Sequence, residues 1–425
     1  MEKAIDVTAK KKSFAIQEDW VIVLLGFLII LMSLFLYTAP VPSYGWKNAD
    51  DLARKVFSES NIGAMAIQFI LTYAIGILAT LLMRKPVKSL IVVFPVIFIL
   101  TLIAQILTGN NEVKALNLEA VIFSLALGLI VGNLFNLPEW FRAVLSAELF
   151  VKIGLVLLGT SVIFTDIVKA GSLGLVQALI VVLSVWYFAY WLCKKLKLDE
   201  ELTMMLSSAV SICGVSAAIA TAGAIKGDPK KLSYVISLVL ITAIPMMIFM
   251  PYIANYFGFS QEVTGAWLGG SIDTTGAVVA SGTLVGETAL KISTIVKFSQ
   301  NVLLGLAAFV ISIYWTYAKE KAPGNQEAKP TLGVIWDRFP KFVIGFLAAS
   351  FLFSFLLPSE AISGVKNSLK SIQTLWFVLA FTSIGLETRF ADLTSKQGSK
   401  PLVAFVIAQL FNIIVTLLVA YLLFG

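Results

Sequence analysis

The sequence has no histidine and few charged residues, with Asp, Glu, Lys and Arg making up only 13% of its 425 positions. Soluble domains carry about a quarter charged residues, which cover their surface with polar groups. This chain is 58% hydrophobic and has a mean hydropathy of +0.90. A water-soluble fold is therefore excluded, and the sequence predicts a protein dissolved in a lipid bilayer.

Other absences limit the chemistry. Without histidine there are no imidazole metal ligands or imidazole proton relays, so Asp, Glu and Lys must carry any proton. Two cysteines, Cys193 and Cys213, do not make a disulfide framework. Because HExxH, GxSxG and GxxxxGK motifs are also missing, we expect no enzyme activity, no metal and no cofactor.

Long apolar runs are abundant. A membrane-spanning helix needs about 20 apolar residues, and roughly 13 such runs are found, at 20–37, 62–83, 89–107, 118–136, 146–165, 172–192, 203–225, 232–254, 263–285, 289–317, 341–357, 372–388 and 401–424. Lys and Arg fall more often on the segments that are internal when the N-terminus is cytoplasmic. We interpret the net charge of +7 as this topological bias, not as a nucleic-acid-binding surface. The sequence thus predicts an all-α polytopic protein with a cytoplasmic N-terminus.

Two regions follow from the distribution of spans. Residues 1–117 form an N-terminal region with three spans, and residues 118–425 form the core, interrupted by a polar linker at 319–340. Within the core, the sequence of spans four to six resembles that of spans eleven to thirteen, which indicates an internal repeat. The matching pairs have one constant separation: Gly159 with Gly385, Phe164 with Phe390, Asp166 with Asp392, and Ile167 with Leu393.

The two copies of this repeat are an odd number of spans apart, so they have opposite orientations in the membrane. An inverted repeat with a glycine-interrupted helix in each half is typical of secondary transporters. Candidate binding positions are therefore Gly159, Thr160, Ser383 and Gly385. The alternative is that short Gly/Phe/Asp matches arise by chance in a biased membrane sequence.

Polar groups at membrane depth mark cavities or buried contacts. The seventh span contains small and polar residues, Ser211, Cys213, Gly214 and Ser216, which soften a helix and offer hydroxyls and free amides. Close packing between helices is an equally good explanation for such small residues. The ninth span carries Ser271, Asp273, Thr274 and Thr275 between glycines, which indicates an unwound turn that binds an ion or a substrate. The alternative is a short loop at the membrane edge.

The tenth span carries Lys297, followed by Gln300 and Asn301, and we expect all three to bind the substrate, with Lys297 supplying positive charge. This lysine lies too deep to reach the interface easily, although it could also serve only to hold the fold by pairing with Asp273. Glu148 and Lys152, one helical turn apart, are more typical of a structural ion pair. Asn133 is a further candidate of secondary rank.

The chain resembles the YeiH-like (UPF0324-type) family of bacterial inner-membrane proteins, which are described as sulfate exporters. The resemblance runs from about Ala120 to the C-terminus, and its motifs are LGLIVGN, VKIGLVLLGTSV, SICGVSAAIA, GGSIDTTGAVVASG, TIVKFSQNVLL and SIGLET. It implies a fold similar to sodium/proton antiporters, in which two interrupted helices cross at the substrate site. It also implies the bacterial inner membrane and, by analogy, a homodimer.

This chain departs from the family pattern at the candidate site. Where the family has His-Glu-Val-Ala-Gln, this sequence has Asp273, Thr274, Thr275, Gly276 and Ala277. Where the family has Lys-x-x-Arg-Asn, it has Lys297, Gln300 and Asn301, so the arginine is lost. The resemblance therefore transfers the fold but not the substrate.

Three functions are open. The leading hypothesis is secondary active transport of a small anion, such as sulfate, an organic sulfonate or a carboxylate, by alternating access. Asp273 is then the coupling residue together with Lys297, with protons or sodium as the coupling ion. The second is a cation/proton antiporter in which Asp273 binds the ion. The third is a membrane scaffold or sensor that transports nothing.

Overall fold

The structure is a computed structural model that describes residues 17–115, 119–142, 144–319, 332–388 and 399–425. In this part of the chain every regular element is a helix. The elements up to the first break of the seventh span are α1 (Glu18–Phe35), α2 (Ala49–Asp51), η1 (Leu52–Val56), α3 (Glu59–Leu82), α4 (Val87–Thr108), α5 (Asn111–Ala115), α6 (Ala120–Leu134), α7 (Glu139–Arg142), α8 (Ala147–Leu158), η2 (Gly159–Ser161), α9 (Phe164–Lys195), α10 (Glu200–Ser208) and η3 (Ala209–Cys213).

The remaining elements are α11 (Val215–Ile225), α12 (Pro229–Tyr256), α13 (Gln261–Ser271), α14 (Thr275–Val285), α15 (Glu287–Lys319), α16 (Gly333–Arg338), α17 (Lys341–Phe351), η4 (Leu352–Leu356), α18 (Ser359–Glu387) and α19 (Ser399–Phe424). Within the described residues, nine helices are long and apolar enough to cross a membrane, and four shorter apolar helices accompany them. Each of the predicted spans coincides with one helix or with a broken pair. The all-α polytopic membrane fold is therefore confirmed.

Several of these helices begin with a side-chain cap in the loop that precedes them. Asp199 accepts a hydrogen bond from the Leu202 amide (3.2 Å) at the start of α10. Asp228 accepts one from the Lys230 amide (2.8 Å) just before Pro229, the first residue of α12. Such caps satisfy amides that have no partner inside the helix, and proline at the first position costs no hydrogen bond.

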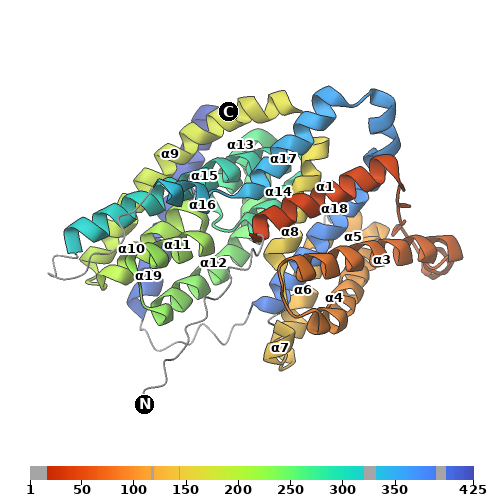
Figure 1. The fold of residues 1–425 in the computed structure, drawn as a ribbon, viewed down its shortest axis with the longest axis horizontal. Helices are drawn as coiled ribbons and strands as arrows, with labels where there is room; N and C mark the ends of the chain where they lie inside the picture. Colours follow the sequence, from red (N-terminus) through yellow and green to blue (C-terminus); the bar gives the residue numbers. More distant parts are fainter. Residues whose placement is uncertain (1–16, 116–118, 143, 320–331, 389–398) are drawn as a thin grey trace, which may run out of the picture.

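The helices form two groups. We call α1, α3, α4, α6, α8, α17 and α18 the panel, and α9–α15 with α19 the crossing bundle (Figure 1). Each group is densely packed internally, whereas the two groups meet mainly through α14, which contacts α6, α8 and α18. In Figure 1 the panel helices α3, α4 and α18 lie to the right and α9, α10 and α19 to the left.

The predicted interruption at Gly385 is wrong, because α18 runs unbroken from Ser359 to Glu387. This glycine instead lets two helices touch. A Cβ atom on Gly385 would lie 2.5 Å from the Leu125 carbonyl of α6, and one on Gly128 would lie 2.4 Å from the Thr382 carbonyl of α18. Small residues at these positions allow close backbone contact between membrane helices.

Gly159 also does not split a helix, since it starts the short 3₁₀ turn η2 that follows α8. A Cβ atom there would lie 2.4 Å from the Phe346 carbonyl of α17, so the position is again one of close contact. The repeat counterparts Phe390, Asp392 and Leu393 lie outside the described residues, as does most of the linker 319–340. The inverted repeat therefore stays a prediction.

The interruptions are found in the seventh and ninth spans. The seventh span passes from α10 through the π-helical turn η3 and breaks at Gly214, whose φ of +60° strongly favours glycine. The ninth span breaks between Ser271 and Thr275. The two breaks touch, because a Cβ atom on Gly214 would lie 3.0 Å from the Cβ atom of Asp273. Two broken helices thus cross inside the crossing bundle.

Candidate functional site

At the crossing, the carbonyl ends of both first halves are occupied by side chains from α15. Lys297 Nζ donates to the Ile212 carbonyl at the end of η3 (2.9 Å) and to Gln300 Oε1 (3.0 Å). Gln300 Nε2 donates in turn to the Gly270 carbonyl near the end of α13 (2.9 Å). Both side chains are buried. Because helix C-termini carry partial negative charge, an ammonium group is well placed there.

Two amides of α19 complete this arrangement, and our sequence analysis did not single them out. Gln409 Nε2 donates to the Ser271 carbonyl (2.8 Å). Asn412 Nδ2 donates to the carbonyls of Ser271 (3.2 Å) and Val210 (3.1 Å), so it joins both broken helices. The available signal was the presence of two amide side chains within an otherwise apolar span.

Asp273 lies in the break of the ninth span, with only 2% of its surface exposed. Lys297 is the cation whose charge acts on it, and the Gln409 side chain lies beside its carboxyl group. Its Oδ2 atom has no hydrogen-bond partner within the described residues. The lysine and the aspartate, which the sequence led us to pair, are therefore close enough to interact electrostatically while Lys297 makes its hydrogen bonds to backbone and amide oxygens.

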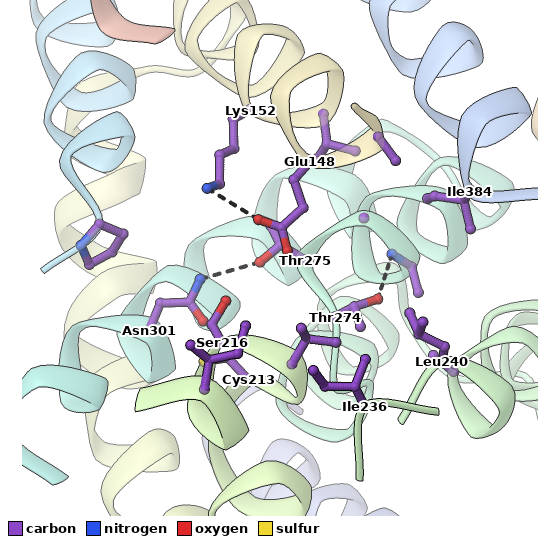
Figure 2. Close-up of a pocket in the computed structure, with 18 of the residues that line it drawn as sticks. Glu148, Lys152, Cys213, Ser216, Ile236, Leu240, Thr274, Thr275, Asn301 and Ile384 are labelled. Carbon is purple, nitrogen blue, oxygen red and sulfur yellow. Dashed lines mark hydrogen bonds and ion pairs between the residues drawn. The ribbon is translucent and has the colours of Figure 1, made fainter. Parts of the chain in front are cut away.

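The second halves of the broken helices begin at a cavity of ≈ 430 Å³ that lies between the panel and the crossing bundle. We call it the crossing cavity. Its wall includes Val215 and Ser216 from the start of α11, and Thr274 and Thr275 from the start of α14 (Figure 2). Gly214, which precedes α11, has no side chain to cap it, and the Cys213 sulfur accepts from the Ala217 amide, which leaves the Val215 and Ser216 amides. The first amides of a helix have no partner inside it and carry partial positive charge, so both helix starts offer donors to the cavity.

Hydroxyl and amide groups surround these helix starts. Thr274 Oγ1 accepts from the Ala277 amide (3.3 Å), which caps α14. Asn301 Nδ2 donates to Thr275 Oγ1 (3.3 Å), while Asn301 Oδ1 is buried and has no partner among the described residues. Ser216 and Cys213 line the same wall. Figure 2 shows Cys213, Ser216, Thr275 and Asn301 on the side of the cavity opposite the backbone of α8.

The mouth of the cavity is formed partly by α8. Lys152 Nζ pairs with Glu148 (3.3 Å), as the spacing predicts, and also with Asp19 of α1 (3.1 Å). Asp337, Arg338 and Glu387 also line this cavity. The cavity wall therefore has more carboxylates than cations, and the Glu148 side chain points from α8 toward Thr275 at the start of α14 (Figure 2).

The structure places the other predicted residues away from the crossing cavity. Ser211 is buried and donates to the Ser207 carbonyl (2.8 Å), and the Ser271 hydroxyl is buried behind the crossing. Ser383 is buried within α18. Asn133 Nδ2 donates to the Thr388 carbonyl (2.9 Å), which ties the end of α6 to the end of α18. Thr160 lines a different cavity.

Metal ligands are not gathered at any point of the described chain: no group of three or more Asp, Glu or Cys side chains is placed to hold an ion there. Lys297, Gln300 and Asp273 are not part of the cavity wall in this conformation and lie directly behind it. The site thus consists of a donor-lined cavity backed by a buried, charged crossing.

Comparison with known proteins identifies the family. Residues 92–405, which begin inside α4, match the family described as conserved hypothetical protein 698. A UPF0324 membrane protein of Rhodopirellula baltica is 40% identical over 367 residues, covering 84% of this chain and 67% of that protein. The chain belongs to the UPF0324 family.

Other UPF0324 relatives agree with this assignment. One from Nitratidesulfovibrio vulgaris is 37% identical over 354 residues, which cover 80% of this chain and 61% of the relative. One from Nitrosomonas europaea is 28% identical over 464 residues and covers 93% of both chains. The chain therefore spans about two thirds of the length of the relatives from Rhodopirellula and Nitratidesulfovibrio. No solved structure matches.

Proposed function

We propose that this UPF0324 protein is a secondary active transporter of a small anion, of the sulfate, organic sulfonate or carboxylate class. The observation that supports the proposal is the direction in which the ends of the broken helices point. The N-terminal ends of α11 and α14 face one cavity, whereas the carbonyl ends of η3 and α13 face protein side chains. Two positive helix ends at one cavity make an anion site.

The same direction of the helix ends argues against a cation at this crossing. A cation would bind at the carbonyl ends, as coupling ions do in transporters with broken helices. Here Lys297, Gln300, Gln409 and Asn412 already donate to those carbonyls. A free cation would have to displace an ammonium group that is buried and hydrogen-bonded.

Asp273 is our candidate for the coupling residue. Its carboxyl group is buried at the point where the two helix breaks touch, it faces the charge of Lys297, and Oδ2 lacks a partner. Adding a proton at this carboxylate would change the charge of the crossing by one unit. That change would alter how strongly the neighbouring helix ends hold an anion, which couples the two ligands.

A cation/proton antiporter is the second candidate, and one observation favours it. Four carboxylates, from Asp19, Glu148, Asp337 and Glu387, line the crossing cavity against the two cations Lys152 and Arg338. Such a mouth attracts cations. Lys152 is ion-paired with two of these carboxylates, Asp19 and Glu148, which reduces the excess.

The setting in the cell belongs to the same proposal. We place the protein in the bacterial inner membrane with its N-terminus in the cytoplasm, because Lys and Arg are biased to the segments on that side. Asp19 at the start of α1 lines the crossing cavity, so this cavity opens toward the cytoplasm in that orientation. Export, alternating access between panel and crossing bundle, and a homodimer follow by analogy with inverted-repeat transporters.

The test is a thermal-shift screen of the detergent-purified protein against sulfate, sulfite, organic sulfonates and dicarboxylates, with sodium, potassium and pH as controls. A ligand at 100 times its Kd stabilises the folded state by about 2.7 kcal/mol. Thr275→Val removes one hydroxyl from the cavity and should weaken anion binding about tenfold, because a hydrogen bond to a charged group contributes about 1.5 kcal/mol.

Thr242→Val is the matched control: among the described residues the Thr242 hydroxyl bonds only within its own helix, to the Leu238 (2.9 Å) and Val239 (3.1 Å) carbonyls, and Thr242 does not line the cavity. It should leave anion binding unchanged. Stabilisation that follows only sodium, potassium or pH, and that is lost in Asp273→Asn, would replace the anion transporter by the cation/proton antiporter.

A further inference from the structure

A second cavity, of ≈ 560 Å³, lies at the other ends of the helices that form the crossing cavity. The crossing cavity is lined by the start of α8, the start of α14 and the end of α18. The second cavity is lined by the end of α8 with η2, the end of α14 and the middle of α18. The two cavities therefore lie toward opposite faces of the membrane along one seam between panel and crossing bundle.

The barrier between the cavities is short. On α8, Val151 lines the crossing cavity and Leu158 lines the second one. On α14 the corresponding residues are Ala277 and Thr283. Six or seven residues of α-helix span about 10 Å. Two helical turns of packed side chains are thus all that separates the two spaces.

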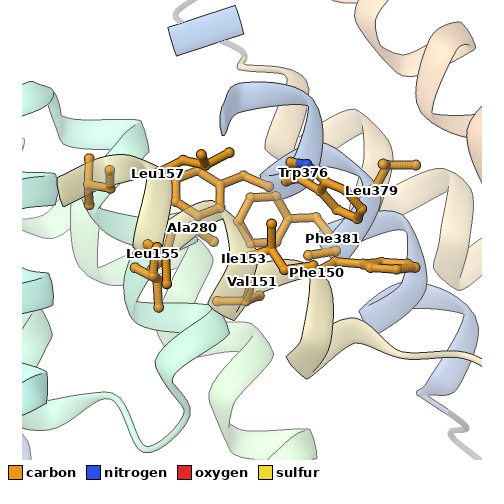
Figure 3. Close-up of a cluster of buried hydrophobic side chains, with 14 of the residues drawn as sticks. Phe150, Val151, Ile153, Leu155, Leu157, Ala280, Trp376, Leu379 and Phe381 are labelled. Carbon is orange, nitrogen blue, oxygen red and sulfur yellow. The ribbon is translucent and has the colours of Figure 1, made fainter. Parts of the chain in front are cut away.

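That barrier is apolar and tightly packed. Figure 3 shows Phe150, Leu155 and Leu157 of α8 with Ala280 of α14 and Phe381 of α18 in one buried cluster. A Cβ atom on Gly154 would lie only 2.4 Å from the Phe377 ring, so α8 and α18 are in close contact here. The labelled contacts between the panel and α14 in this cluster are apolar. Movement of the panel relative to α14 would therefore separate these side chains without breaking a buried hydrogen bond within the cluster shown.

The second cavity has the opposite charge to the mouth of the first. Three lysines, Lys291, Lys366 and Lys370, face two carboxylates, Glu119 and Glu287. Glu287 is ion-paired with Lys370 and also feels the charges of the other two lysines. Several hydroxyls, including that of Thr160, complete the wall. A concave site with excess positive charge concentrates anions.

We propose that the second cavity is the vestibule through which the transported anion passes on the other side of the membrane, with Lys291 and Lys366 as its collecting charges. This inference rests on the proposed anion transport. The apolar cluster of α8, α14 and α18 is the gate that separates the vestibule from the helix starts in the crossing cavity. Thr160, a candidate from the sequence, belongs to the vestibule and not to the crossing.

The test uses cysteine accessibility and needs no knowledge of the substrate. In a Cys193→Ala, Cys213→Ser background, Thr160→Cys is exposed in intact cells to an anionic and a cationic methanethiosulfonate reagent. Ser161→Cys is the second position, in case the first variant fails to fold. We expect both reagents to react from outside, and the anionic one to be favoured when rates are normalised to a free thiol.

Lys291→Gln and Lys366→Gln should each lower the anionic-to-cationic rate ratio about twofold, which is the effect of one charge roughly 8 Å away in water with physiological screening. Lys47→Gln, on the exposed segment between α1 and α2 and outside this cavity, is the control and should leave the ratio unchanged. A position that reacts only from the cytoplasmic side, or a ratio insensitive to Lys291 and Lys366, overturns the vestibule.

The two proposals fail separately. A preserved charge preference at Thr160→Cys together with no anion-induced thermal shift overturns the proposed anion transport, because the vestibule then serves no anion cycle. Anion-induced stabilisation without any charge preference overturns the vestibule alone and leaves the crossing cavity as the binding site.

Discussion

Replacing Lys297 tests whether the charges of Lys297 and Asp273 at the crossing stabilise each other. Lys297→Met keeps a long side chain but removes the hydrogen bonds to the Ile212 carbonyl and to Gln300. It also removes the cation that acts on Asp273, whose carboxyl group is fully inside the protein. Losing one partner of a buried charge pair typically costs about 3–5 kcal/mol, because the other charge is left uncompensated.

The second variant of the cycle, Asp273→Asn, leaves Lys297 with its two oxygen partners. We therefore expect a smaller loss, of about 1–3 kcal/mol, in the range that follows when a buried group loses its partner. The double variant Lys297→Met/Asp273→Asn removes both charges together. It should be more stable than the sum of the single changes predicts, by a coupling energy of about 1–3 kcal/mol.

The measurement is the free energy of unfolding of the four proteins by denaturant titration in one detergent. Lys169→Met is the control, because Lys169 is exposed and a surface change away from special contacts stays within about 0.5 kcal/mol. Additive losses in the cycle would refute the reasoning, since the aspartate and the lysine would then not depend on each other.

Three further predictions concern the helices around the site. Gly214→Ala should lower the free energy of unfolding by about 2–4 kcal/mol and abolish transport in proteoliposomes. The reason is that φ is +60° and the new methyl group would collide with Asp273 and Val239. A normal transport rate would contradict the crossing geometry. Gly128→Leu should destabilise the protein by about 3 kcal/mol in the same titration, because the larger side chain would separate α6 from α18. An unchanged midpoint would show that the contact is dispensable. Lys152→Met should destabilise the protein by about 1–3 kcal/mol, because the Lys152 and Asp19 side chains are only 19% and 21% exposed and the change leaves the Asp19 carboxylate without its cation. It should also raise the cation-to-anion preference at the mouth; an unchanged free energy of unfolding would show that the pair with Asp19 does not hold α1 in place.

The spans and the two helix breaks could be predicted from the sequence. Membrane-spanning helices can be recognised by their length and hydropathy, because every backbone N–H and C=O group inside the bilayer must have a hydrogen-bond partner. The polar clusters around Gly214 and Asp273 indicated unwound segments, and the structure places both breaks there, in contact with each other. Intramembrane polarity is expensive enough to be informative in a single sequence.

The errors arose where one residue type serves two purposes. Gly159 and Gly385 were interpreted as breaks, but they allow close contact with α17 and α6, and glycine in a pattern cannot distinguish these uses. The caps from Gln409 and Asn412 depend on α19 lying beside the crossing, which no local pattern encodes. Likewise, Lys297 is directed to carbonyl oxygens behind the cavity because of how α15 packs.

The most direct test of the central claim is to locate the ion at the crossing by anomalous diffraction. Crystals of the protein are soaked separately with selenate, a heavy sulfate analogue, and with rubidium. We predict a selenium peak in the crossing cavity beside the starts of α11 and α14, between Ser216, Thr275 and Asn301, and no rubidium peak there. Rubidium at this position, or selenate found only elsewhere, would contradict the account.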